Sequence, residues 1–86
     1  MKKFSVNLFS VLVLLVPIIV FAQDPVTLFK QARNAYNKGN YEESVNLYRK
    51  ILLQGRESAS VHYNMGNAYF RTGELGEAIL HFEKAK

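Results

Sequence analysis

Residues 39–45 read Gly-Asn-Tyr-Glu-Glu-Ser-Val, and residues 73–79, 34 positions further along the chain, read Gly-Glu-Leu-Gly-Glu-Ala-Ile. The same offset pairs residues of similar size, aromatic character or charge: Ala32 with Gly66, Tyr36 with Phe70, Glu43 with Glu77, Val45 with Ile79, Tyr48 with Phe82 and Lys50 with Lys84. Matches of several kinds at one offset indicate a structural unit that is repeated.

Each unit is predicted to contain two short helices. Apolar side chains recur at helical spacing within residues 25–38, at Leu28, Ala32, Ala35 and Tyr36. Asp24 can cap this helix with Pro25 in its first turn, and Gly39 ends it. Asn40 can cap the next helix, with Glu43 completing a capping box and Gly55 at the end. The buried face of that helix is predicted to hold Tyr41, Ser44, Val45, Tyr48, Ile51 and Leu52.

The second unit is predicted to repeat this arrangement from Ala59 onward, with Ser58 as the N-cap of its first helix. Glu74 stands at the cap of its last helix, where glutamate is a poor capping residue, so this boundary is the least defined. The apolar and small residues that recur at helical spacing are Met65, Gly66, Tyr69 and Phe70 on the first helix, then Leu75, Ala78, Ile79, Phe82 and Ala85 on the second. The chain is therefore predicted to be all-α.

Small and large residues alternate where paired helices would cross. Ala32 and Gly66 lie on the first helices of the two units, and Ser44 and Ala78 lie on the second helices. Two large side chains cannot share one crossing point, so small residues there allow a close approach. Tyr48 and Phe82 are expected to fill the adjacent space.

The second unit, His62-x2-Met65-Gly66-x2-Tyr69 followed by Ala78-x3-Phe82, resembles the tetratricopeptide repeat pattern. The departures are His62 in a slot that is usually aromatic, Gln31 and Ala35 in the first unit, and Arg56 in the usual proline slot. The resemblance implies a right-handed stack of antiparallel helix hairpins, an α-solenoid of about two repeats at residues 25–58 and 59–86. The last helix lacks a polar capping helix, so Leu75, Ile79 and Phe82 are expected to have one side facing water. We therefore expect a longer protein, or a partner or second copy covering that edge.

A narrower resemblance covers residues 28–48 (LFKQARNAYNKGNYEESVNLY) and 61–85 (VHYNMGNAYFRTGELGEAILHFEKA). Behind a signal peptide, these segments are similar to the N-terminal part of BatE-type aerotolerance proteins, envelope tetratricopeptide proteins of Bacteroidota. This resemblance implies a role as an adaptor or scaffold in the cell envelope.

Residues 1–22 have the organisation of a signal peptide. Lys2 and Lys3 precede an apolar run at residues 11–21 (VLVLLVPIIVF), and cleavage is expected between Ala22 and Gln23. The alternative is that residues 4–22 remain as an uncleaved membrane anchor that tethers a self-associating spacer, although Pro17 and three polar residues interrupt that segment. Both interpretations predict an exported chain in the periplasm or cell envelope.

The resemblance also implies a concave face that binds a peptide or protein partner. Its residues would be Phe29, Lys30, Arg33, Tyr36, Asn37, Tyr63, Asn64, Asn67, Phe70 and Arg71. The three cations would favour an acidic segment or a C-terminal carboxylate. The alternative for Tyr36 and Phe70 is that they are core residues. Only Asn64 and Asn67 match the carboxylate clamp of chaperone-binding relatives, so that clamp is not predicted.

Other functional classes find little support in the composition. Lys2 and Lys3 are two of the 11 basic residues, so residues 23–86 hold nine against seven acidic ones, without the dense basic stripe of a nucleic-acid binder. The chain has no cysteine. His62 and His81 are its two histidines, and both are expected to be surface imidazoles without the further ligands that a metal site needs. Ser58 and Ser60 near His62 lack an orienting acid. We therefore expect no catalytic residues, cofactor or metal.

Overall fold

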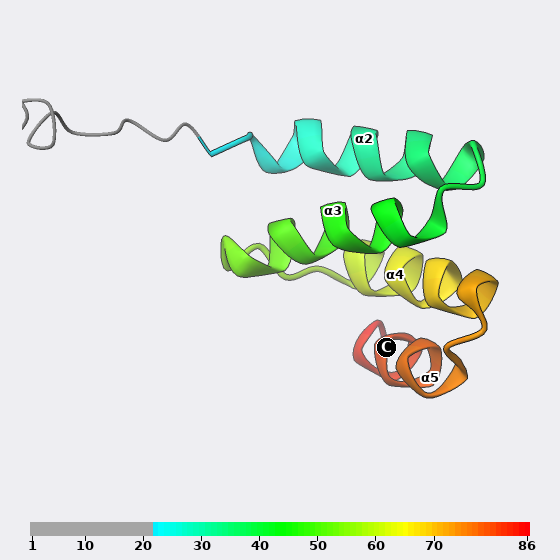
Figure 1. Cartoon of the computed structure of the whole chain (residues 1–86). Helices are drawn as coiled ribbons and strands as arrows, with labels where there is room; N and C mark the ends of the chain where they lie inside the picture. Colours follow the sequence, from blue (N-terminus) through cyan, green and yellow to red (C-terminus); the bar gives the residue numbers. More distant parts are fainter. Residues whose placement is uncertain (1–21) are drawn as a thin grey trace, which may run out of the picture.

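The computed structural model describes residues 22–86 (Figure 1). The predicted signal peptide or anchor falls almost wholly on residues 1–21, outside this described part. Four helices follow one another: α2 (Pro25–Asn37), α3 (Tyr41–Leu53), α4 (Ala59–Thr72) and α5 (Leu75–Lys84). The described residues contain no strand, which confirms the all-α prediction. None of these helices combines the length and apolar character needed to cross a bilayer.

The helices form two hairpins, α2–α3 and α4–α5, called the first and second hairpin below. Figure 1 shows α2, α3 and α4 in successive layers with alternating direction, and α5 below α4 at the C-terminal end. Tight turns join the helices within each hairpin. At the first of these turns, Gly39 has φ +82°, where glycine carries no steric penalty, and Gly73 repeats this conformation with φ +85°. The N–H groups of Gly39 and Asn40 donate to the carbonyls of Tyr36 and Ala35, closing the end of α2.

The predicted helix caps are only partly correct. The Ser58 hydroxyl accepts the N–H of Val61 at 3.1 Å, as predicted. Asp24 and Asn40 make no side-chain cap, and the capping box with Glu43 does not form. Asn40 has ψ 70°, and its counterpart Glu74 has ψ 76°, whereas Ser58 is extended with ψ 158°. Ser58 caps its helix from an extended backbone conformation. The tight turn after Gly39 prevents Asn40 from adopting that conformation, so its side chain does not cap α3.

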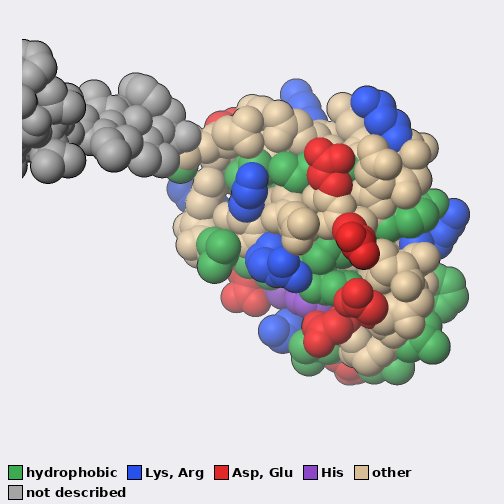
Figure 2. Space-filling model, viewed as in Figure 1, with side chains coloured by type: hydrophobic (Ala, Val, Ile, Leu, Met, Phe, Trp, Pro, Cys, Tyr) green, Lys and Arg blue, Asp and Glu red, His purple; other side chains and the backbone are tan. Residues whose placement is uncertain are grey.

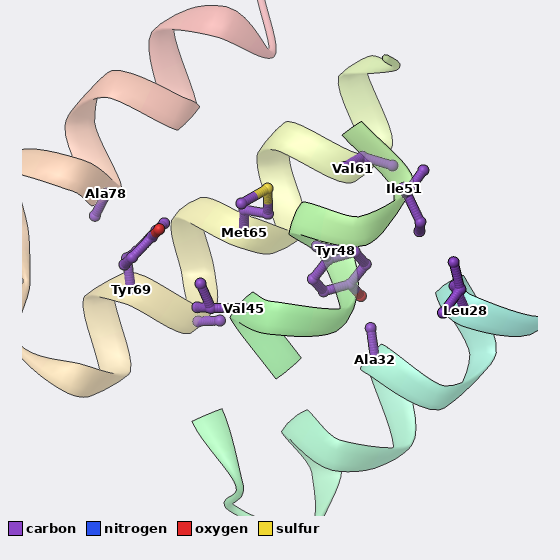
Figure 3. Close-up of a cluster of buried hydrophobic side chains, with 10 residues drawn as sticks. Leu28, Ala32, Val45, Tyr48, Ile51, Val61, Met65, Tyr69 and Ala78 are labelled. Carbon is purple, nitrogen blue, oxygen red and sulfur yellow. The ribbon is translucent and has the colours of Figure 1, made fainter. Parts of the chain in front are cut away.

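One hydrophobic core runs through all four helices (Figure 3). On α3, the predicted face is confirmed for Ser44, Val45, Tyr48 and Ile51, with Tyr41 and Leu52 partly buried. The core cluster consists of Leu28, Ala32, Val45, Tyr48, Ile51, Val61, Met65, Ala68, Tyr69 and Ala78.

Three large apolar side chains on the helical stripes of the second hairpin face solvent, as expected for Leu75 and Ile79 on an uncovered last helix. Leu75 is 54% exposed, Ile79 is 62% exposed and Phe70 is 59% exposed. The repeat position of Ile79 is equivalent to that of Val45 on α3. Val45 is only 4% exposed, because it belongs to the core and α3 is covered by α4. No later helix within residues 22–86 covers α5, so the same repeat position faces solvent there.

The small residues at the helix crossings have the predicted role. A Cβ atom on Gly66 would lie 2.5 Å from Cε1 of Phe82, so α4 and α5 approach closely only because residue 66 has no side chain. In the first hairpin, the hydroxyl of Ser44 donates to the carbonyl of Ala32 at 2.8 Å. Close contact at both positions confirms the alternation of small and large residues.

Candidate partner-binding groove

The same side of α2 and α4 carries a narrow hollow of about 80 Å³. Polar side chains dominate its lining, which consists of Arg33, Tyr36, Asn37, Tyr48, Asn64 and Asn67. Arg33 and Asn64 also line a wider, open hollow of about 600 Å³, together with Phe29, Ala59, Ser60, Tyr63 and Ala85. Because the two hollows share residues, they form one continuous surface, called here the α2–α4 groove.

Seven of the ten residues predicted for the concave face line this groove. They are Phe29, Arg33, Tyr36, Asn37, Tyr63, Asn64 and Asn67. Lys30, Phe70 and Arg71 do not. The guanidinium of Arg71 instead lies over the rings of Tyr41, at 4.8 Å, and Tyr36, at 5.9 Å. This cation–π contact leaves Arg33 as the one cation lining the two hollows.

The structure answers the question left open for the two aromatics. Phe70 is 59% exposed and does not belong to the core. Tyr36 is half-buried, packs against the core, and forms an edge-to-face pair with Tyr41 with centroids 5.2 Å apart. Tyr36 therefore contributes both to packing and to the groove wall.

Tyr48 forms part of the groove lining, a role that the sequence did not reveal. Its ring is buried in the core (Figure 3), yet its side chain also lines the narrow hollow between α2 and α4. Burial raises the pKa of Tyr48, and a hydrogen bond from Asn64 and the positive charge of Arg33 oppose that rise. The groove therefore presents a neutral phenol beside an amide and a guanidinium.

Two aromatic pairs support the wider end of the groove. The rings of Phe29 and Tyr48 meet edge-to-face with centroids 5.5 Å apart, and those of Tyr63 and Phe82 lie 5.9 Å apart. These pairs occupy equivalent positions in the two hairpins. Each places one ring in or against the core and a second ring, Phe29 or Tyr63, at the groove surface. The surface aromatics are therefore held in place before any partner arrives.

The sequence model for the tetratricopeptide repeat matches residues 29–86, which include most of α2 and all of the other three helices. The chain belongs to the tetratricopeptide repeat family. Members of this family generally mediate protein–protein interactions and are generally not enzymes. Comparison with curated proteins gives no match. Comparison with solved structures gives none either.

The prediction of surface histidines in this tetratricopeptide protein is wrong. His62 on α4 is 3% exposed and His81 on α5 is 7% exposed, and their Nδ1 atoms lie 3.0 Å apart. Nε2 of His62 lies 2.7 Å from Oε1 of Glu57, a side chain that is itself exposed. Figure 2 shows only a small area of histidine surface between neighbouring side chains. His62 takes a core position of the repeat, and its hydrogen bonds to His81 and Glu57 satisfy both ring nitrogens there.

This cluster does not form a metal site. Among the described residues, no group of three or more histidine, aspartate or glutamate side chains is placed to hold a metal ion. The 34-residue repeat offset could have predicted that the two histidines are buried. The residues equivalent to His62 and His81 are Leu28 and Leu47, and an apolar residue at an equivalent position indicates a buried site.

Proposed function

We propose that this chain is an exported tetratricopeptide module that binds a peptide or protein partner through the α2–α4 groove and serves as an adaptor in the cell envelope. The observation that carries the proposal is the groove itself. Residues from both hairpins meet there, and seven of them are among the concave-face residues that the resemblance to the family implies. Pre-positioned aromatic rings beside amides are suited to an extended peptide, since rings contribute contact area and amides bond main-chain groups.

The charge of the groove favours a partner with an acidic segment or a free C-terminal carboxylate. Arg33 lines both hollows, and within residues 22–86 no aspartate or glutamate lines either of them. Three asparagines, Asn37, Asn64 and Asn67, line the narrow hollow together with Arg33 and offer amide donors and acceptors. A carboxylate bound beside Arg33 would form a charge-assisted hydrogen bond, which is stronger than a neutral one.

The groove can be tested with two double variants of α2 and its C-terminal end. Arg33→Ala with Asn37→Ala removes one cation and one amide from the groove. Asn34→Ala with Lys38→Ala removes the same chemistry from exposed positions that do not line it. We expect the first variant to weaken capture of a partner from an envelope extract at least about tenfold and the control to leave it unchanged. Equal loss in both variants would contradict the proposal.

Export is supported by the basic start and apolar run of residues 1–22 and by the resemblance to aerotolerance-type envelope proteins. The proposed cut between Ala22 and Gln23 falls in exposed, non-helical residues just before α2. Cleavage there leaves every described helix intact. Sequencing the N-terminus of the protein recovered from cells tests this, with Gln23 expected as the first residue. An intact Met1 would instead support the anchor at residues 4–22.

A second candidate function is a self-associating spacer, and the exposed face of α5 favours it. Leu75, Ile79 and Leu80 are 45–62% exposed on this helix, and Figure 2 shows hydrophobic side chains gathered along the lower edge of the molecule. The opposite edge is polar, because Thr27, Gln31 and Asn34 of α2 occupy the positions equivalent to buried Val61, Met65 and Ala68.

An apolar edge and a polar edge do not stack head to tail, so association would pair α5 with α5 of a second copy. Sedimentation equilibrium of the full chain and of Ile79→Lys tests this candidate. If the chain is a self-associating spacer, the full chain should form a dimer and Ile79→Lys should be monomeric. A wild-type chain that stays monomeric at all concentrations would exclude this function.

A further inference from the structure

The second hairpin contains a chain of hydrogen bonds that runs from the exposed side chain of Glu57 to two buried histidines and that depends on their protonation. Glu57, before α4, contacts His62 Nε2 at 2.7 Å, and His62 Nδ1 contacts Nδ1 of His81 on α5 at 3.0 Å. A carboxylate is an acceptor only, so Nε2 of His62 carries a proton. The contact between the two Nδ1 atoms needs one proton, because two N–H groups would oppose each other and two lone pairs would form no bond.

This requirement limits how many protons the pair can hold. Two imidazole rings have four nitrogens, and the bond survives when two or three of them are protonated. With four protons, both Nδ1 atoms carry hydrogen, the bond is lost, and two positive rings are in contact in a buried site. The rings lie nearly parallel with centroids 5.2 Å apart, so little water can screen their repulsion.

The groups around the pair make full protonation less favourable. The ring of Tyr69 on α4 stacks on His81 at 5.4 Å, and Arg49 from α3 donates to the Tyr69 hydroxyl at 2.9 Å. Arg49 and Lys84 add positive charge near His81, while Glu77 opposes them and Glu57 reaches only His62. The buried ring of His81 therefore faces more positive than negative charge.

We propose that the His62–His81 pair makes the attachment of α5 to α4 sensitive to mild acid, so that α5 detaches while the first hairpin stays folded. The pKa of His81 agrees in direction, since burial first, and then the charges of His62, Lys84 and Arg49, hold it below its ordinary value of 6.5. A histidine whose pKa is lowered by folding stabilises the folded state fully above pH 6.5. That stability is lost as the pH falls from 6.5 toward the folded-state pKa.

The first hairpin provides an internal control. Its positions equivalent to His62 and His81 hold Leu28, buried in the core, and Leu47, partly buried against it. Leucine at both positions is therefore compatible with the hairpin architecture and does not titrate. The double substitution His62→Leu with His81→Leu transfers this arrangement to the second hairpin. His81→Gln is a milder variant, because an amide can still bond Nδ1 of His62 without titrating.

The experiment is an amide NMR titration of the full chain from pH 7.5 to 5.0, in which Gly76 reports on α5 and Gly39 reports on the first hairpin. Below pH 6.5, the ratio of detached to attached α5 is expected to rise by up to about tenfold per pH unit. Gly39 is expected to keep its folded signal, and both variants are expected to remove the response of Gly76.

Three results would overturn the proposal. One is a Gly76 signal that does not change with pH in the wild-type chain. Another is a wild-type response that persists in the variants, and if the leucine variant fails to fold, His81→Gln decides this point. The third is simultaneous loss of the Gly39 and Gly76 signals, which would mean that the whole chain unfolds and α5 does not act separately.

Discussion

The two hairpins share one backbone design and close it with different side-chain chemistry. In the first, Leu28 and Leu47 are apolar, and the Ser44 hydroxyl bonds the Ala32 carbonyl. In the second, their counterparts include two histidines bonded to each other, and Ala78 replaces the serine. The first hairpin thus has a polar contact between two neutral groups, and the second has one between two ionisable side chains. Equivalent repeat positions therefore conserve volume and burial more closely than charge.

The hairpins also differ in what covers them, and substitution of the equivalent aromatics should show the difference most strongly. Tyr48 is 1% exposed between α2 and α4, whereas Phe82 is only partly buried at the edge. Tyr48→Ala is expected to lower the free energy of unfolding by about 3–5 kcal/mol, and Phe82→Ala by clearly less. Circular dichroism during urea unfolding measures both. Equal losses would show that α5 is covered as fully as α3.

The closest helix contact offers a second comparison. Gly66→Ala would place a Cβ atom 2.5 Å from the Phe82 ring, and we expect it to displace that ring and lower stability by about 1–2 kcal/mol. Helix propensity alone predicts a gain of about 1 kcal/mol from the same substitution. Thermal unfolding of Gly66→Ala distinguishes the two, since a higher midpoint would mean that Phe82 yields without cost.

The smallest expected effect concerns the hydrogen bond that only the first hairpin has. Ser44→Ala removes the bond to the Ala32 carbonyl and is expected to lower the free energy of unfolding by about 1 kcal/mol. Ala78→Ser places a hydroxyl at the equivalent site, opposite the carbonyl of Gly66. If Ala78→Ser raises the free energy of unfolding by as much as Ser44→Ala lowers it, the two crossings are interchangeable. Failure to recover it would show that they differ in more than this one bond.

Most of the fold could be predicted from the 34-residue offset. Small residues at the crossings, helix ends at Gly39 and Gly55, and the cap at Ser58 all follow from local rules. The cap at Asn40 failed because the tight turn after Gly39 fixes its backbone. The exposure of Leu75 and Ile79 was expected from the missing capping helix and not from periodicity, because periodicity on one helix does not show which helices cover it.

The groove could be predicted only in part. The resemblance to the tetratricopeptide family implied ten concave-face residues, and seven of these line the two hollows. Arg71 was misplaced because its partner Tyr41 lies on another helix. Tyr48 was assigned to the core alone, since spacing locates a Cα atom and does not show how far a long side chain extends. The burial of the histidine pair was not predicted, because histidine is usually polar and exposed. The equivalent positions in the first repeat, which hold leucines, would have indicated burial.

The most direct test of the proposed function uses a photo-crosslinking amino acid placed singly at Asn37 and at Asn34 in the full chain. Both are exposed on α2, but only Asn37 lines the α2–α4 groove. Irradiated cells should yield one discrete adduct from position 37 and none from position 34. Adducts of equal yield from both positions, or from position 34 alone, would contradict binding through the groove.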